Sequence, residues 1–501
     1  MTELAEKARR SVLWTTGFTV FQDVLQFGLT LTLTRLLPPE AYGKFSFVTT
    51  LIGFFTVISF REFLNHTLQV RSNEETHYQD HFTAGAVLQT ALFLLVNLVA
   101  FGLRFTTTYA PAAPLLHLMS PLLLLDLVSE FRTKMLERQF EWQRLRTLHA
   151  VGLVAGAVVA VTMAFTGFGV YALLVPSFCT SLPLAWDLFV TAGWRPTWEW
   201  SAERYRSARR FGTTRIGSTS LVSASNLAEN AALTRAIGFT QLGLYNRALS
   251  LAALACQRTA SLLMNALYPV LTRVPVRTPQ YRRAATLVLR FVAWTVIPAA
   301  FALAWFAEPL TRTLYGSRWV AAIPLMPYTA ALSAILALVQ TNYTLLLAHQ
   351  QQRLCFVADV MRLVGMVILL ALLLPFGLRP YICGLLALHS TALVMTTVWL
   401  WRDTVFDGEG LISAVGPALA GSLAGSLVAI VVPTSLGTPL TPFFALAWQG
   451  GLFFIGYFLF LRLCCANWMR DIVMHLPQRD RIAAILRLRT VPETLAPSMP
   501  L

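Results

Sequence analysis

Charged side chains within long apolar stretches are the residues of this sequence best suited to chemistry. Asp23, Glu229 and Arg258 stand in or near the middle of such stretches. A charge at that depth costs about 2.5–3.5 kcal/mol on membrane-insertion scales, and it therefore marks an ion or substrate pathway. A carboxylate there can carry a proton or a cation, and an arginine can hold an anion through several directed hydrogen bonds. The other charges in such stretches are Arg61, Glu62, Asp126, Glu130, Asp187, Arg215, Arg247, Asp359 and Arg362.

Several of these charges have a structural explanation. Asp359 and Arg362 are three residues apart, on one face of a helix, and are expected to pair with each other. Five others lie near the predicted ends of helices, where long side chains reach water, namely Arg61, Glu62, Glu130, Arg215 and Arg247. Asp23, Glu229 and Arg258 are harder to explain in this way.

The motifs of several enzyme classes are absent from the sequence. None of the lysines stands in a Gly-Lys-Ser/Thr sequence, which excludes the phosphate-binding loop of nucleotide hydrolases. Neither His-Glu-x-x-His nor Gly-x-Ser-x-Gly occurs. His66, His77 and His81 stand near acidic residues in a predicted inner loop, but a solvated polar loop explains them as well as a metal site does. We therefore expect no catalytic residue, no metal site and no cofactor.

The composition is that of a membrane protein. Hydrophobic residues make up 56% of the chain and charged residues 13%, and the mean hydropathy is +0.60, far above a soluble domain. Runs of about 20 apolar residues, enough for a helix to cross a bilayer, recur along the sequence. We predict fourteen spans, near 12–34, 45–65, 84–103, 110–129, 148–166, 169–192, 212–234, 246–271, 286–306, 321–347, 354–376, 380–400, 411–432 and 441–461.

The basic residues predict the orientation of these spans. If the N-terminus is cytoplasmic, the inner loops and tails hold about 26 of the 39 Lys and Arg residues, and the outer loops hold about seven. This bias predicts an even number of spans with both termini in the cytoplasm. It also explains the net charge of +15 without nucleic acid as a partner, although anionic membrane lipids are a further partner for it. The first span is expected to remain as a signal anchor.

A repeat indicates that the chain is a duplicated half. Residues 8–43 recur without a gap at 208–243, with nine identities in 36 positions. A period of about 200 residues is too long for a solenoid or a propeller, whereas duplicated halves are typical of membrane transporters. The identities include Ala8-Arg9-Arg10 with Ala208-Arg209-Arg210, Gly17 with Gly217, Thr34-Arg35 with Thr234-Arg235, and Gly43 with Gly243.

Proline and glycine mark predicted turns and close helix contacts. Pro38-Pro39 cannot continue a helix and predicts a turn after the first span. Gly43 and Gly243 suit a tight return into the next span. Two Gly-x-x-x-Gly pairs permit close helix packing, Gly152 with Gly156 and Gly421 with Gly425.

Two stretches resemble a known family. They are Leu33-Thr-Arg-Leu-Leu-Pro-Pro-Glu-Ala-Tyr-Gly-Lys-Phe45 and residues 227–248, the latter followed by Tyr268-Pro-Val-Leu-Thr-Arg273. Both resemble the polysaccharide exporters and O-antigen flippases of the multidrug/oligosaccharidyl-lipid/polysaccharide superfamily. Many members have an Asp in the seventh helix, where this chain has Glu229-Asn230.

The resemblance implies an architecture. It predicts two pseudo-symmetric bundles of six helices, in residues 1–205 and 206–402, with a central cavity that opens alternately to either side. Two further helices would fill 403–465, and a cytoplasmic tail 466–501. The family's cargo is an oligosaccharide on an undecaprenyl diphosphate, moved across the bacterial inner membrane for O-antigen, exopolysaccharide or capsule synthesis.

That cargo assigns roles to the charges singled out above. The diphosphate needs cationic hydrogen-bond donors, and we predict that Arg258 binds it together with Arg215 or Arg61. Asp23 and Glu229 would set the field of the cavity or carry a coupling proton or monovalent cation. Arg35 and Arg235 form a symmetric pair at the outer ends of their helices, where they either anchor the interface or guide the diphosphate on release.

Two other functions remain open at this point. One is a cation-coupled multidrug exporter of the same superfamily. The other is an integral-membrane polysaccharide polymerase or ligase, which the short outer loops disfavour. Polymerases or glycosyltransferases are also the expected protein partners of a flippase.

Overall fold

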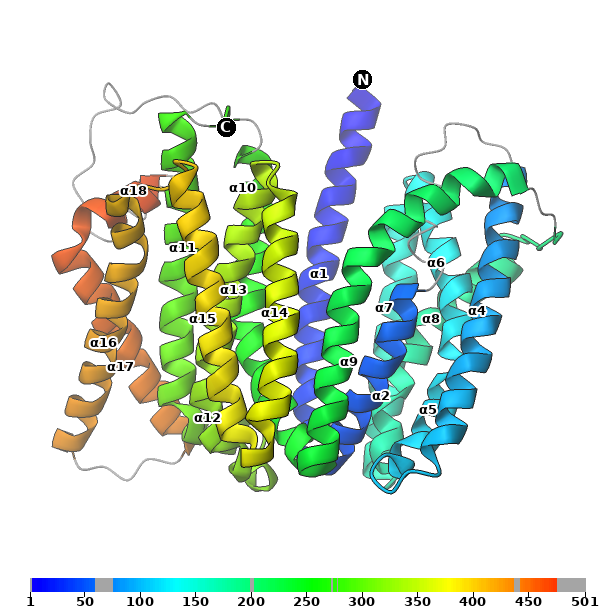
Figure 1. Cartoon of the computed structure of the whole chain (residues 1–501), viewed down its shortest axis with the longest axis horizontal. Helices are drawn as coiled ribbons and strands as arrows, with labels where there is room; N and C mark the ends of the chain where they lie inside the picture. The colour runs from blue at the N-terminus through cyan, green and yellow to red at the C-terminus, as the bar shows by residue number, and fades with distance from the viewer. Residues whose placement is uncertain are drawn as a thin grey trace. The chain divides into compact units, whose positions relative to one another are not determined.

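The structure is a computed structural model that describes residues 2–58, 75–198, 202–271, 274–276, 278–436 and 442–474. Throughout these residues the regular structure is helical (Figure 1). Within them, ten helices are long and apolar enough to cross a membrane, and each coincides with a predicted span. The chain is therefore an all-α, multi-pass membrane protein, as predicted.

The chain forms two compact units, Met1–Leu244 and Tyr245–Leu501, which divide inside helix α9. The first unit holds α1 (Thr2–Leu36), α2 (Pro39–Ile58), α4 (Glu75–Leu103), η2 (Ala110–Ala112), α5 (Ala113–Met119), α6 (Leu122–Arg138), α7 (Trp142–Phe165), η3 (Gly169–Leu173), α8 (Val175–Trp186), η4 (Asp187–Thr191) and most of α9 (Ala202–Ala253). The second holds η5 (Leu254–Arg258), α10 (Thr259–Leu271), α11 (Pro279–Trp305), α12 (Ala307–Leu314), η6 (Ser317–Leu325), α13 (Met326–Ala348), α14 (Gln352–Leu372), η7 (Leu374–Phe376), α15 (Leu378–Arg402), α16 (Gly408–Leu436), α17 (Pro442–Cys464) and α18 (Ala466–Met474).

Four predicted spans are not among the ten apolar helices. They lie near 12–34, 45–65, 212–234 and 246–271, and they are the first two spans of each predicted half. The described parts of all four are nevertheless helical. The predicted boundary between bundles at 205/206 follows the sequence repeat and stays a prediction.

Gly43 of α2 and Gly243 of α9 each pack against the other's helix. A Cβ atom on Gly43 would collide with the carbonyl oxygen of Phe239, and one on Gly243 with the carbonyl oxygen of Pro39. The contacts are reciprocal at the repeat offset of 200 residues, since 39 corresponds to 239 and 43 to 243. A twofold relation between two copies produces this kind of exchange. The predicted pseudo-symmetry is thus present in backbone contacts.

The two glycines lie within helices, so their predicted role in a tight turn is wrong. The chain is instead interrupted at Pro38, just before α2, and at Gly238 within α9, where φ is +75°. Proline cannot continue a helix, whereas glycine adopts a positive φ at low cost. Two different residue types therefore break the helix at equivalent positions.

A second turn repeats where the sequences no longer match. α6 joins α7 through Phe140, and α13 joins α14 through Gln350, with φ angles of 58° and 59°. In both turns the next residue donates its N–H to the carbonyl five residues earlier, at 3.0 and 2.9 Å. The duplication therefore extends through the fourth and fifth helices of each half, at an offset of 210 residues.

The helices that meet at this turn are tied to a third helix differently in the two units. In the first unit, Asp187 accepts from Arg132 of α6 at 2.7 Å and from Arg144 of α7 at 2.7 Å. The side chains of Arg132 and Asp187 are almost completely buried. In the second unit, the amide of Asn342 in α13 donates instead to the hydroxyl of Thr396 in α15 at 3.1 Å. One fold thus uses an ion pair in one half and a neutral hydrogen bond in the other.

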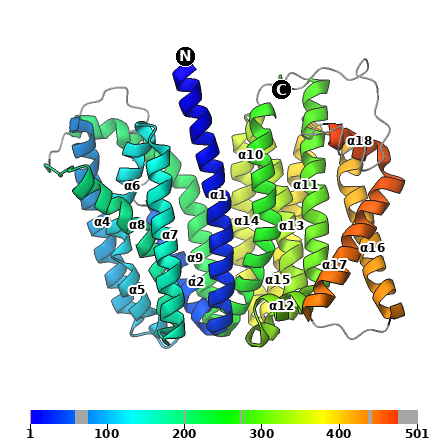
Figure 2. The same ribbon diagram turned by 180° about the vertical axis from the view of Figure 1, so that it is seen from behind.

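The Gly-x-x-x-Gly pairs serve close packing, as predicted. A Cβ atom on Gly152 or Gly156 would meet atoms of α8, and one on Gly421 or Gly425 would meet α17. α16 also packs on α11, and α17 on α12, so the last two spans belong to the second unit (Figure 2).

We expect Gly43→Ala to destabilise the protein by about 1–3 kcal/mol or more, as overpacked cores are destabilised. The new methyl group would meet backbone atoms, which cannot rotate away. Thermal unfolding of the purified protein in detergent measures this loss. Gly53→Ala on the same helix is the control, because a Cβ atom there meets nothing within 4 Å. Equal unfolding temperatures for the two variants would contradict the close crossing.

We expect Asp187→Asn to cost about 3–5 kcal/mol, because it leaves the buried Arg132 without its charged partner. Glu308→Gln is the matched control, since Glu308 and Arg312 form an exposed pair 3.0 Å apart that contributes at most about 1 kcal/mol. The same unfolding measurement compares them. A loss no larger for Asp187→Asn than for Glu308→Gln would show that the buried pair is not needed for stability.

Candidate functional site

Helices α1 and α9 carry the same row of polar residues. On α1, spacings of four, three and four residues bring these side chains to one face. The α1 row is Thr19, Asp23, Gln26 and Thr30. At an offset of 200 residues its last three members return as the α9 row, Ser223, Asn226 and Asn230.

The two rows are not buried within the protein. Gln26 and Asn226 are exposed, while Asp23, Ser223 and Asn230 are half-buried. Polar groups at membrane depth are expensive when they face hydrocarbon, and they face a bundle interior or a water-filled space instead. The rows are therefore suited to line a polar path, and they explain why α1 and α9 are less apolar than the other spans.

The two predicted coupling carboxylates both lie at these rows. Asp23 belongs to the α1 row, and Glu229 stands beside Asn230 of the α9 row. Both are half-buried, and the Asn230 amide donates to the carbonyl oxygen of Asn226 at 3.0 Å. The structure thus places both carboxylates on the polar helices of the first unit. Their predicted roles stay predictions.

The symmetric arginines are placed alike in the two copies. Arg35 and Arg235 are exposed, whereas the threonine before each is fully buried. Each threonine hydroxyl donates to the carbonyl oxygen four residues earlier, at 2.6 and 2.7 Å. The phenol of Tyr109 donates to the carbonyl of Ala231 at 3.0 Å. Burial raises the pKa of Tyr109, and the charge of Arg235 opposes that rise.

Arg258 stands at a local irregularity in its helix. It is the last residue of η5, a single π-helical turn between α9 and α10, and such turns are frequent at functional sites. Its side chain is exposed, whereas Cys256 of the same turn is fully buried. An exposed arginine in the middle of a membrane span is expected to face water.

The two predicted partners of Arg258 cannot be placed beside it. Arg61 lies outside the described residues, and although Arg215 is on α9, its side chain lies outside them too. Arg258 belongs to the second unit, whereas Asp23, Glu229 and the α9 backbone at Arg215 belong to the first. The residues predicted to bind the diphosphate therefore do not all belong to one unit.

Two buried charges have partners that the sequence did not reveal. Asp187 joins the ion pairs described above. Arg290 of α11 was not among the candidates, yet it is 6% exposed and donates to Ser413 of α16 at 2.8 Å and to Asp471 of α18 at 3.3 Å. Arg290 thus joins α11 to α16 and to α18 within the second unit. Its only sequence signal is a lone charge in an apolar span.

Charged and titratable groups also meet in the second unit. Asp359 and Arg362 pair at 3.2 Å, as predicted from their spacing. The Tyr343 hydroxyl donates to the same Asp359 oxygen at 3.1 Å, and Tyr343 was not among the sequence candidates. Within the described residues, no group of three His, Cys, Asp or Glu side chains is arranged to hold a metal ion. His81, predicted in a loop, is buried on α4, and His66 lies outside the described residues.

Known proteins resemble this chain in sequence and in fold. The family model for polysaccharide biosynthesis proteins matches residues 32–324. The succinoglycan biosynthesis transport protein ExoT of Rhizobium meliloti (strain 1021) is 28% identical over 335 residues, which cover 65% of this chain and 67% of that protein.

Solved membrane transporters share the fold. The lipid II flippase MurJ in an inward closed conformation matches with a TM-score of 0.64 at 14% identity, over 92% of this chain and all of that one. An inward-facing MATE multidrug transporter of the MOP superfamily matches with a TM-score of 0.58 at 14% identity, over 76% of this chain and 94% of that one.

The family match covers more than half of the chain, including both stretches on which the sequence resemblance rested. The resemblance inferred from those stretches is therefore confirmed. The transporter fold agrees with the duplicated, pseudo-symmetric architecture. This chain belongs to the family of polysaccharide biosynthesis proteins.

Proposed function

We propose that this protein is a flippase that moves an undecaprenyl-diphosphate-linked oligosaccharide from the inner to the outer leaflet of a bacterial inner membrane. The observation that carries the proposal is the pair of polar rows on α1 and α9. A sugar needs a wet, hydrogen-bonding path, and these rows supply one face of it in each half. Family membership and the sequence similarity to a succinoglycan transport protein support a polysaccharide cargo.

The charges fit the other parts of such a cargo. Arg258 would hold the diphosphate, with Arg215 or Arg61 as the second donor, because arginine binds phosphate oxygens through paired N–H groups. Asp23 and Glu229 would carry a coupling proton or cation, or tune the field along the path. Arg35 and Arg235, exposed at the outer ends, would anchor the interface or meet the departing diphosphate.

The orientation follows from the distribution of basic residues. Both termini would lie in the cytoplasm, so the lipid-linked sugar would be loaded where glycosyltransferases assemble it. Translocation breaks no covalent bond, so the proposal requires no catalytic residue. A multidrug exporter would use the same fold, but the family match and the polysaccharide relative favour the sugar cargo.

Deleting the gene tests this function directly. We expect the lipid-linked oligosaccharide to accumulate on the inner leaflet, because its synthesis continues while its exit stops. Labelling of the sugar from either side of inverted and right-side-out vesicles measures the distribution. Unpolymerised oligosaccharide on the outer leaflet would instead indicate a polymerase or ligase, and an unchanged distribution with increased drug sensitivity would indicate a drug exporter.

We expect Arg258→Ala to lower export by about 10- to 100-fold, because hydrogen bonds between charged groups are each worth about 1.5–3 kcal/mol. The amount of protein in the membrane should not change, since Arg258 is exposed. Arg312→Ala, at an exposed surface pair, is the control. Full export by Arg258→Ala would refute the assignment.

A further inference from the structure

An arginine of α7 lies against aromatic rings instead of a carboxylate. The guanidinium carbon of Arg146 is 5.3 Å from the centre of the Phe18 ring on α1 and 5.8 Å from that of the Trp142 ring on α7. α1 and α7 pack side by side in the first unit (Figure 2). His149 of α7 contacts the same Phe18 ring, with the ring centres 6.1 Å apart. We call Phe18, Trp142, Arg146 and His149 the α1–α7 site.

The hydrogen-bond donors of Arg146 are not used within the described part of the chain. Arg146 forms no hydrogen bond or ion pair with any described residue, and its Nε is enclosed without an acceptor. Glu137 of α6 is the carboxylate whose charge acts on Arg146, but Glu137 accepts a hydrogen bond from Lys134 at 2.8 Å. The aromatic rings attract the cation and leave its N–H groups without an oxygen acceptor.

Both rings of the site are held in place by the protein. Phe18 is 8% exposed, so its ring is enclosed by neighbouring helices. Trp142 packs against a cluster of three buried leucines, Leu136, Leu145 and Leu184, from α6, α7 and α8. Fixed rings hold the guanidinium in one position, and a donor that is positioned in advance loses less entropy when it binds a ligand.

The site lies one turn inside the end of a membrane span. α7 begins at Trp142, so Arg146 is four residues, or about 6 Å, along the helix. A long basic side chain at that depth reaches the level of the lipid headgroups, and tryptophan is typical of the membrane interface. With the orientation proposed above, this is the cytoplasmic end of α7. The phosphate groups of inner-leaflet lipids are therefore the anions nearest to Arg146.

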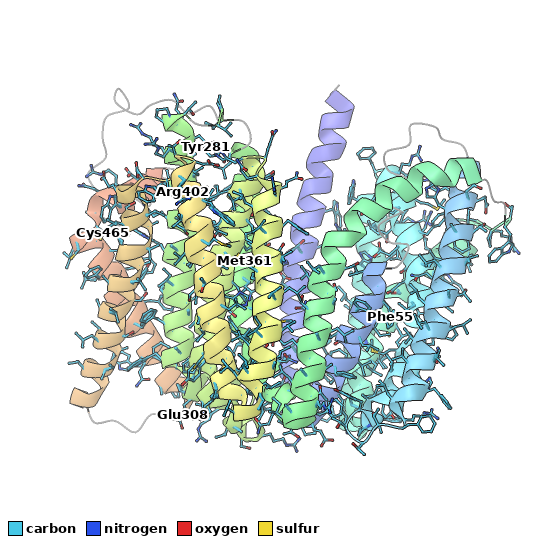
Figure 3. All side chains as sticks on the ribbon, in the orientation of Figure 1. Phe55, Tyr281, Glu308, Met361, Arg402 and Cys465 are labelled. Carbon is cyan, nitrogen blue, oxygen red and sulfur yellow. The ribbon has the colours of Figure 1, made fainter. Side chains whose placement is uncertain are left out.

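The equivalent position of the second unit holds an apolar residue. The repeated turn before α7 and α14 places Phe356 at the counterpart of Arg146, 210 residues later. Phe356 is 57% exposed. Tyr281, labelled in Figure 3, packs edge-on against His349 of the same turn and marks this end of the second unit. The repeated turn therefore does not require an arginine at this position.

A cation held by rings is available to an anion from outside the protein. Arg146 and His149 stand three residues apart, which places them on one face of α7, so one anion can contact both. Phosphate suits this pair, because two of its oxygens accept parallel N–H bonds from a guanidinium. A further oxygen accepts from an imidazole N–H.

We propose that the α1–α7 site binds the phosphate group of a membrane lipid, with Arg146 as the main donor and His149 as the second. Two lipids carry this chemistry. One is a phospholipid of the bilayer, which would join α1 to α7 at the membrane surface. The other is the isoprenoid diphosphate of the cargo, a source that rests on the proposed flippase function. Because Phe18 precedes Thr19, the first residue of the α1 row, a diphosphate bound here would lie at the start of that row.

The experiment measures lipid binding to the full-length protein in detergent by native mass spectrometry. The probes are phosphatidylglycerol, farnesyl diphosphate and a glucosyl diacylglycerol, which has no phosphate. We expect Arg146→Met to weaken the binding of a phosphate-bearing probe by about 10- to 100-fold, the effect of losing a hydrogen bond between charged groups. His149→Phe removes only the second donor and should weaken it less. Binding of the glucosyl lipid should not change in either variant.

The two sources give different results. A loss confined to phosphatidylglycerol identifies a phospholipid site, a loss confined to farnesyl diphosphate identifies a site for the cargo's diphosphate, and a loss for both shows that the site takes either.

A matched control separates this site from general surface charge. Arg353 is an exposed arginine near the equivalent end of α14, and Arg353→Met should bind every probe like the unmodified protein. An equal loss for Arg353→Met and Arg146→Met would overturn the proposal.

A purely structural role of Arg146 predicts another result. In that case Arg146→Met lowers the unfolding temperature without lipid and leaves the affinity for both phosphate-bearing probes unchanged, which would also overturn the proposal. Arg146→Lys keeps the charge and loses the planar donor group, so we expect it to fold normally and still bind phosphate more weakly.

The binding experiment contains no transport step, so its failure is distinguishable from that of the proposed function. Unchanged lipid binding by the Arg146 variants would refute the site and leave the flippase function intact. Arg146-dependent binding in a protein that moves no lipid-linked oligosaccharide would refute the flippase function and leave the lipid-phosphate site intact.

Discussion

The close crossing of α2 and α9 is the contact on which the rest of the first unit depends. At Gly43 and Gly243 two backbones approach so closely that neither tolerates a Cβ atom. The crossing sets the position at which the second span of each half begins. It therefore also sets where α1 and the first part of α9 end. The polar α1 and α9 rows are therefore held in register by two residues that carry no side chain. Close approach through small residues is the usual way to bind helices in lipid.

Duplication explains which features are shared by the halves, and divergence explains which are not. Backbone features persist where sequence identity has faded, as at Phe140 and Gln350, whose φ angles differ by only one degree. Side chains at equivalent positions have diverged in charge. Arg132 pairs with Asp187 in one unit, whereas its counterpart Asn342 donates to the hydroxyl of Thr396 in the other. The two halves thus share their backbone geometry and differ in the charges of their side chains.

The sequence predicted elements well and long-range partners poorly, for physical reasons. Apolar runs and local spacings act within one helix, so ten spans, the glycine pairs and the Asp359–Arg362 pair could be read from the chain. The partners of Arg290 lie 123 and 181 residues away, a distance that no local pattern encodes. Gly43 was singled out in the sequence but was predicted to lie in a turn, because close helix crossings and tight turns both favour glycine. The polar rows on α1 and α9 can be found in the sequence only when the two copies of the repeat are compared by the polarity of their residues, because most of the residues in the rows are not identical.

The placement of the charges follows from what each half must do. Charges that stabilise the fold are buried with a partner, as Arg132 and Arg290 are, and they join helices that already pack together. Asp23, Glu229 and Arg258 are instead half-buried or exposed at membrane depth, where water or a polar cargo can reach them. Asp359 and Arg362 are paired with each other but only partly buried, with side chains 28% and 29% exposed. An oligosaccharide needs hydrogen-bonding groups along its whole length, which the long polar rows of α1 and α9 supply and a single charged pair does not.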